Sequence, residues 1–213
     1  MAKRAGGTKP TTKGGNSSAG DAEERLIEAA LALAVAKGWR GISLGEIVEA
    51  AGLPLASAYR LHLSKVGILD GLRRRTDRAV LAGPVPDAGT PPRDRLFDVL
   101  MRRFDALQPH QVALRAILRD AFGDPASMLA VPKILASMAW MLEAAGISTA
   151  GWSGKLRVNV LAGVYLSVFR VFLDDESSDL TATMAALDRR LRGAESLLRL
   201  SRFGPKEPSK VSN

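Results

Sequence analysis

The chain has 213 residues, of which 46% are hydrophobic, so it can form one or two small domains with a packed core. It has no Cys and a formal net charge of +8, which excludes disulfides and thiolate metal sites and favours an anionic partner such as nucleic acid. Because no run of about 18 apolar residues occurs and no apolar segment follows the basic N-terminus, we expect no membrane-spanning helix, no secretory signal and a cytoplasmic location.

Residues 1–20 form a basic segment that is rich in Gly, Ser, Thr and Lys and has almost no large apolar side chains. Such a segment cannot bury enough apolar surface to offset the loss of chain entropy, so we expect a disordered tail. Two roles remain open for it, a solubilising tail or a basic arm that follows the DNA backbone. Residues 204–213 are expected to form a second disordered tail.

Helical periodicity begins at Asp21, which is a suitable N-cap, and the Gly at position 38 is a suitable stop for this first helix. Ser43 and Glu46 have the spacing of a capping box, which predicts that a second helix starts at about Leu44. The N-terminal third of the chain is therefore expected to consist of short helices with well-marked ends.

The second helix is expected to end at Gly52, where a left-handed backbone costs least, and Pro54 can open a third helix. Ser64 would cap a fourth helix over residues 65–81. Two short helices joined by a Gly-containing turn form a helix-turn-helix, whose second helix fits the major groove of DNA. The sequence therefore predicts a helix-turn-helix DNA-binding domain over residues 21–82.

Residues 83–92 are rich in Pro, Gly and Asp and are expected to form a linker. The pattern beyond it stays helical, which predicts a second helical domain over residues 93–203. Two long helices, over residues 154–173 and 180–202, are joined by a short connector and should lie antiparallel. Since no segment shows useful strand alternation, the predicted fold class is all-α.

Residues 22–82 resemble the DNA-binding domain of the TetR family of bacterial repressors. The matching positions run without a gap over roughly 60 residues: Gly38, Ser43, Ala50-Ala51-Gly52, Tyr59 and Ser64-Lys65. The resemblance implies a homodimeric transcriptional repressor with two N-terminal heads on a pseudo-palindromic double-stranded DNA operator. It also implies a helical ligand-binding and dimerisation domain behind the heads.

The same resemblance implies roles for individual residues. Tyr59 and Lys65 would contact phosphates, and Ser43 would contact the DNA backbone at the start of the second helix. Ser57 and Arg60 would face the groove. At three positions the chain departs from the family pattern, with Leu55 and Ala56 where a polar or basic residue is common and His62 in place of an aromatic one. The complete set of expected DNA contacts is Ser43, Leu55, Ser57, Tyr59, Arg60, His62 and Lys65.

The segment from Arg157 to Leu191 resembles the end of the COQ9 family, whose members share the TetR-like fold, bind lipid and assist ubiquinone synthesis. The residues that carry this resemblance are Leu161-Ala162, Tyr165, the connector from Asp174 to Asp179, Leu187-Asp188 and Arg190-Leu191. It implies an alternative, a lipid-binding accessory protein with a degenerate DNA-binding head. In that alternative the basic amphipathic end of the chain lies on an anionic membrane surface; otherwise it belongs to a dimer interface over residues 154–202.

The helical domain contains many large, adaptable apolar side chains, which favour a small apolar ligand over a polar one. Methionines and aromatic residues at helical spacing form core more often than pocket lining, so both interpretations remain open for each residue. The expected pocket lining is Met101, Phe104, Met128, Met138, Met141, Tyr165 and Phe169.

No metal or catalytic site is expected. The two histidines, His62 and His110, lie far apart in the sequence, and without Cys a metal site would depend on carboxylates. Ser57 lies near His62, but a capping or phosphate-contact role explains this spacing better than a catalytic pair. We therefore expect a protein that is not an enzyme and needs no cofactor.

Overall fold

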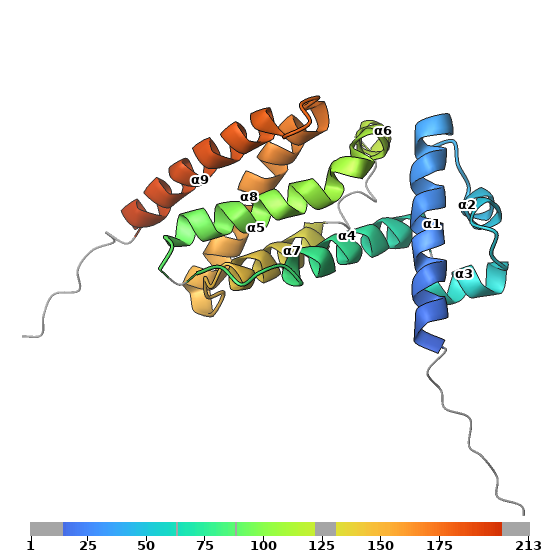
Figure 1. The fold of residues 1–213 in the computed structure, drawn as a ribbon, viewed down its shortest axis with the longest axis horizontal. Coiled ribbons are helices and arrows are strands. Elements are labelled where there is room, and N and C mark those ends of the chain that lie inside the picture. The colour runs from blue at the N-terminus through green and yellow to red at the C-terminus, as the bar shows by residue number, and fades with distance from the viewer. Residues whose placement is uncertain (1–14, 63, 88, 122–130, 202–213) are drawn as a thin grey trace, which may run out of the picture.

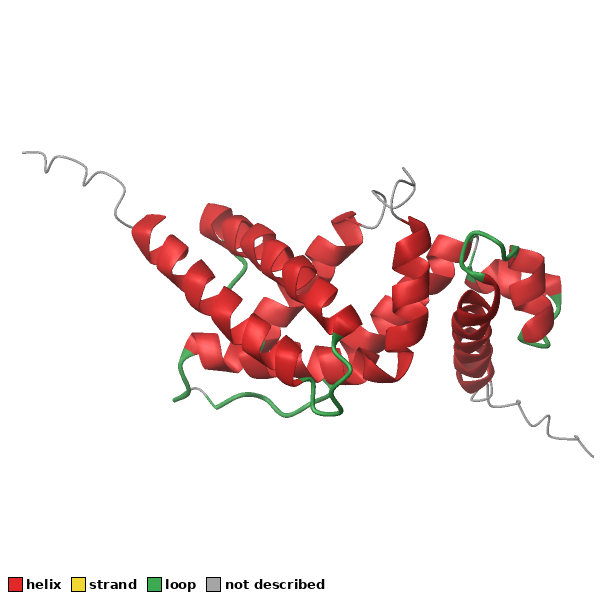
Figure 2. Ribbon diagram, turned by 90° about the horizontal axis from the view of Figure 1, so that it is seen from above, coloured by secondary structure: helices red, strands yellow, loops and turns green. Residues whose placement is uncertain are grey.

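The computed structural model describes residues 15–62, 64–87, 89–121 and 131–201, and every regular element in these ranges is a helix (Figures 1 and 2). The all-α prediction is therefore confirmed. In chain order the elements are α1 (Gly15–Lys37), α2 (Leu44–Ala50), α3 (Leu55–Leu61), α4 (Lys65–Leu81), α5 (Pro92–Leu107), the short 3-10 helix η1 (Gln108–His110), α6 (Gln111–Ala121), α7 (Val131–Ala144), α8 (Gly151–Asp174) and α9 (Thr181–Ser201).

Helix α1 is longer than the sequence predicted. It begins at Gly15, so the expected N-cap at Asp21 and the expected end of the disordered tail at residue 20 were wrong. Helix growth is cooperative, and residues 15–20 contain no Pro that would stop it. The helix ends as predicted, because Gly38 has a φ of 78°, a backbone conformation that favours glycine. Residues 1–14 and 204–213, where disordered tails were expected, lie outside the described residues.

The head consists of α1, α2, α3 and the first part of α4, which lie together at one end of the molecule in Figure 1. Their buried side chains form one apolar core around α1. Helix α6 also contributes to this core through Ala113 and Ile117, although both residues lie beyond the predicted linker. The head and the rest of the chain therefore share packing, and the boundary at residues 83–92 separates them only in sequence.

A second apolar core lies between α5, α7, α8 and α9. Helices α8 and α9 pack side by side and antiparallel, as the short connector predicted (Figure 1). Asp175 holds the turn between them, since its side chain accepts hydrogen bonds from the backbone N–H and the hydroxyl of Thr183, both at 2.7 Å. Burial alone would raise the pKa of Asp175, but hydrogen bonds from Ser177 and Thr183 lower this pKa to about 2.

Helix α4 connects the head with the second core through a buried polar cluster. Asp77 on α4 accepts hydrogen bonds from the guanidinium of Arg103 on α5 and, at 2.5 Å, from the hydroxyl of Ser137 on α7. Its other carboxylate oxygen accepts a bond of 2.6 Å from Arg73, one turn earlier on α4. Arg103 also lies over the ring of Tyr165 on α8, at 5.2 Å from the ring centroid. One carboxylate thus joins the last helix of the head directly to α5 and α7, and through Arg103 to α8.

Helix α8 has the length and composition of a membrane-crossing helix, with a mean hydropathy of 1.6 over its most apolar window. We expected no such helix from the sequence, because no long uninterrupted apolar run occurs. Core helices of proteins outside membranes can have the same length and composition. Only 33% of the window is buried, through packing within the chain. The exposed apolar side chains of α8 include Trp152, Leu156 and Leu166.

Candidate nucleic-acid interface

The turn between α2 and α3 has the geometry of a helix-turn-helix. Gly52 has a φ of 61°, as its predicted role at the end of α2 requires. Arg25 on α1 braces this turn, because its Nε donates to the carbonyl of Ala51 at 2.9 Å and its Nη2 to that of Gly52 at 2.7 Å. The angle between α2 and α3 is therefore fixed by a charged side chain from the long helix that supports them.

A capping box starts α2, as the spacing of Ser43 and Glu46 predicted. The backbone N–H of Ser43 donates to the Glu46 carboxylate at 2.8 Å, and the N–H of Glu46 donates to the Ser43 hydroxyl at 3.2 Å. Hydrogen bonds from Lys37 and from Ser43 lower the pKa of Glu46 to about 2. Ser43 is exposed, so its expected contact with a DNA backbone stays a prediction beside this capping role.

Helix α3 presents one exposed face and buries the other. Ala58 packs into the head core, whereas Leu55 and Tyr59, with 69% and 70% of their surface exposed, point away from it together with Arg60. Ser57 is half-buried, and its hydroxyl lies 3.4 Å from the Arg60 guanidinium. The structure therefore brings four of the expected DNA contacts, Leu55, Ser57, Tyr59 and Arg60, onto one short helix.

His62 does not belong to this exposed face, and its expected contact with the groove was wrong. Its surface is only 5% exposed, and its imidazole fills the space that Gly67 and Gly71 leave open on α4. An extended backbone at the end of α3 turns the side chain inward, where its Nε2 lies 3.4 Å from the Glu23 carboxylate. Burial lowers the pKa of His62, although Glu23 acts in the opposite direction.

Lys65 stands at the start of α4, where Ser64 forms the predicted cap by accepting a hydrogen bond from the N–H of Gly67. Its ammonium donates to the carbonyls of Trp39 and Ile42, at 2.8 and 2.7 Å, and lies 5.0 Å from the centroid of the Trp39 ring. Lys65 therefore holds the loop between α1 and α2 in place. Since an ammonium has three donors, one remains for a phosphate, and that role stays a prediction.

The three successive arginines of α4 pair with acidic residues and do not form an open basic surface. Arg73 bonds to Asp70 at 2.8 Å on its own helix, whereas Arg74 and Arg75 reach across to α1. Their partners there are Glu23 and Glu28, at 3.0 and 2.7 Å. These ion pairs fasten α4 to α1, so the three arginines are engaged within the head.

In the helical domain, most of the residues expected to line a ligand pocket form packed core. Phe104, Met138 and Met141 are fully buried, and the ring of Phe104 lies 5.5 Å from that of Tyr165 and 6.5 Å from that of Phe169. Of the two interpretations, core or pocket lining, core therefore describes the packing of these side chains. Met128 lies outside the described residues.

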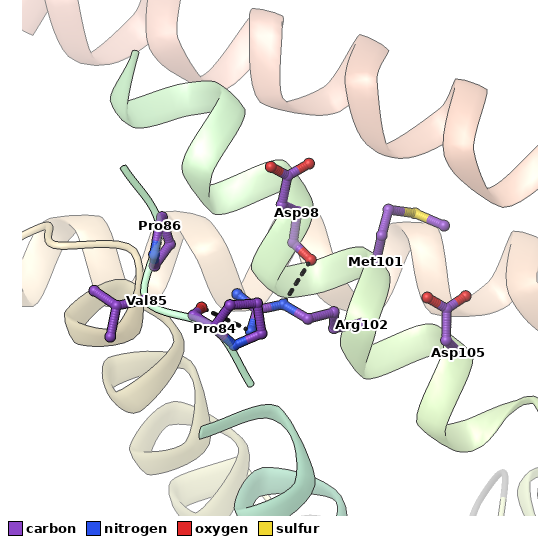
Figure 3. A pocket seen from close by; sticks show the side chains of 7 residues that line it. All are labelled: Pro84, Val85, Pro86, Asp98, Met101, Arg102 and Asp105. Atoms are coloured by element: carbon purple, nitrogen blue, oxygen red, sulfur yellow. Dashed lines mark hydrogen bonds between the residues drawn. The ribbon is translucent and has the colours of Figure 1, made fainter. Parts of the chain in front are cut away.

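Met101 is the expected pocket residue that lines a cavity, a shallow one of about 330 Å³ beside the loop after α4 (Figure 3). Arg102 forms part of its wall and donates to the carbonyl of Pro84 at 3.2 Å. A larger cavity of about 710 Å³ lies between α5, α7, α8 and α9. No pattern in the sequence indicated this second cavity, because it depends on side chains from four separate helices.

Within the described ranges, no three His, Asp or Glu side chains come together in a group that could hold a metal ion. The two histidines lie apart. His110 contacts Arg75 at 2.7 Å, and burial together with this arginine lowers its pKa. The exposed side chains of α3 and its surroundings thus offer hydrogen bonds, positive charge and apolar contacts to a binding partner.

Most of the chain is similar in fold to solved structures of TetR transcriptional regulators. The regulator from Nitrosomonas europaea ATCC 19718 is 22% identical, with a TM-score of 0.65 over 82% of this chain and 98% of that one. The regulator from Rhodococcus sp. RHA1 is 20% identical, with a TM-score of 0.62 over 83% and 97%. A TetR-family regulator from Streptomyces coelicolor is 20% identical, with a TM-score of 0.52 over 87% and 92%.

These similarities establish the TetR-like fold, a helix-turn-helix head followed by a helical domain, over most of the chain. No family model matches the sequence, and no curated protein is significantly similar to it. None of the three structures is described as a COQ9 protein, so the comparison does not support the lipid-binding alternative.

Proposed function

We propose that this chain, whose fold is that of the TetR transcriptional regulators, is a homodimeric DNA-binding transcriptional repressor controlled by a small ligand with a large apolar part. The observation that carries the proposal is the exposed face of α3 on a turn that Arg25 and Gly52 hold rigidly. A helix presented in this way fits the major groove, and its rigidity limits the entropy lost on docking.

The side chains of α3 divide the work of recognition. Arg60 provides a guanidinium that can pair with a phosphate or with the edge of a guanine, and the Tyr59 hydroxyl can donate to a phosphate. Leu55 can contact the methyl group of a thymine but cannot form a bidentate hydrogen bond with a base. We therefore expect an operator in which thymine methyl groups and few base hydrogen bonds determine the sequence preference.

The exposed apolar face of α8 supports the homodimer. Trp152, Leu156, Asn159, Gly163 and Leu166 are exposed and recur at alternating steps of four and three residues, the spacing of a helix-packing seam. A Cβ added at Gly163 would meet nothing within 4 Å, so a partner helix can approach closely there. This face would pack on its copy about a twofold axis, extending the interface expected over residues 154–202 by two residues.

A twofold dimer places two α3 helices in the same relation to each other as two half-sites of a pseudo-palindromic operator. Ligand control requires a ligand that prefers one spacing of the heads over another. The cluster of Asp77, Arg103 and Ser137 supports such control, because any movement of α5 or α7 is transmitted to α4 and so to the head.

The decisive experiment is a selection of bound fragments from genomic or randomised DNA with the full chain. We expect an enriched inverted repeat. In fluorescence anisotropy with this repeat, Arg60→Gln should weaken binding and reduce the slope of log affinity against log salt by about one. Arg119→Gln, which removes an exposed arginine on α6 far from α3, is the matched control and should bind like the wild type.

The proposal fails if no repeat is enriched and no duplex binds in a salt-dependent way. Flotation of the same chain with anionic phospholipid vesicles would then favour the COQ9-like alternative, in which the exposed face of α8 would contact lipid. An equal loss of affinity in Arg60→Gln and Arg119→Gln would instead show that only general charge matters and that α3 has no special place in binding.

A further inference from the structure

The cavity of about 710 Å³ lies at the end of the helical domain remote from the head. The beginnings of α5 and α8 and the ends of α7 and α9 enclose it. Ligand sites for small molecules have volumes of about 300–1,000 Å³, so this cavity has the size of a real binding site. Much of its wall is apolar and is formed by Leu96, Leu142, Leu156, Val160, Leu161 and Leu191.

Charged side chains at the wall of this cavity are mostly satisfied by the protein. Arg93 pairs with Asp94 at 2.8 Å, and Arg157 donates to the carbonyl of Ser148 at 2.9 Å. Glu195 also lines the cavity and already takes part in another contact. These groups therefore shape and polarise the cavity without leaving a strong unmet demand for a ligand.

Arg95 is different. In the part of the chain that the structure describes, no hydrogen bond or ion pair engages its side chain, and its Nε is buried without an acceptor. Its guanidinium lies against Gly146, where an added Cβ would stand 3.5 Å from Nη1. A buried N–H without an acceptor destabilises the fold, and more so when the group is charged. The terminal nitrogens of an arginine without a protein partner in the wall of a cavity can take their acceptor from a ligand.

We infer that this cavity binds an organic anion with an apolar body. The carboxylate, or a comparable oxyanion, accepts hydrogen bonds from the Arg95 guanidinium, and the chain or ring of the ligand contacts the leucines and Val160. An oxyanion can accept from the terminal nitrogens of an arginine, which gives the unpaired side chain an acceptor and neutralises its charge. The inference names the ligand of the proposed repressor and rests on that function only for its regulatory consequence.

The test is a direct binding measurement on the full chain by isothermal titration, with decanoate and the equally long neutral 1-decanol as probes. Decanoate should bind at least about tenfold more tightly, which corresponds to the net value of one hydrogen bond to a charged group. Arg95→Gln should remove this preference and leave decanol binding unchanged. Val160→Trp should fill the cavity and weaken both probes, and Arg119→Gln on α6 should change neither.

The inference is overturned if Arg95→Gln binds decanoate like the wild type, or if Val160→Trp retains full binding, which would mean an adventitious surface site. It is also overturned if neither probe binds the wild type. Thermal melting of each variant shows whether it folds. If Val160→Trp does not fold, the result with Arg95→Gln alone decides the test. Binding to duplex DNA is measured on the same preparations. If the wild type binds its operator but not decanoate, the cavity assignment is refuted and the proposed function stands.

Discussion

Replacing Asp77 by Leu should destabilise the protein by about 3–5 kcal/mol, because the change leaves a buried arginine without its counter-charge. Arg103 is only 3% exposed, so water cannot take the place of the lost carboxylate. Arg73 contributes little to this loss, since it is less buried and keeps its 2.8 Å bond to Asp70. The estimate therefore includes only one buried charge without a partner, that of Arg103.

The assay is urea unfolding at a fixed protein concentration, which holds any contribution of subunit association constant. The double variant Asp77→Leu with Arg103→Met removes both charges and should recover most of the lost stability, because apolar replacement of a complete buried pair is often close to neutral. Asp98→Leu, which alters an exposed carboxylate on α5, should change the free energy of unfolding by no more than about 0.5 kcal/mol. A double variant no more stable than Asp77→Leu would refute the reasoning.

Three further changes test the head. Lys65→Met should cost about 1–3 kcal/mol and weaken operator binding, since two carbonyls of the loop before α2 lose a charged donor; urea unfolding and anisotropy measure the two effects. Gly52→Ala should lower the melting temperature, because φ is 61° and the new Cβ would meet Arg25 Nη2 at 2.9 Å, and an unchanged melt would contradict this geometry. Burial lowers the pKa of His62 below its ordinary 6.5, so the unfolded chain binds protons more readily; stability should be complete above pH 6.5 and fall as the pH drops toward the lowered pKa. In melts across this range, His62→Gln should reduce the decline, His110 should account for a further part of it, and an identical decline in His62→Gln would count against the assignment.

The ends of several helices of the head, though not the start of α1, could be predicted from the sequence because local interactions determine them. Ser43 and Ser64 accept hydrogen bonds from backbone N–H groups only three residues away, and Gly52 adopts a backbone conformation that its own lack of a side chain permits. Such features need no knowledge of the distant chain. The two antiparallel helices at the C-terminal end were predictable for a similar reason, since a short connector restricts their arrangement.

The buried polar groups could not be predicted in the same way, because their surroundings come from distant segments. His62 was expected to contact DNA because of its place in the family pattern, but Glu23 and two glycines of α4 form its environment. Arg103 did carry a usable signal, since it follows Val99 and Leu100 on the core side of α5 at helical spacing. A charged residue at such a position indicates a buried partner, although nothing in the sequence identifies Asp77.

The contribution of Ala113 and Ile117 of α6 to the core of the head has a practical consequence. A fragment cut at the linker would lose one wall of that core and leave apolar side chains of α1 facing water. Chimaeras that exchange heads between regulators of this fold should therefore carry α6 along with residues 15–82. In the intact protein, the same packing connects α1 directly to the helical domain, in addition to the connection through α4.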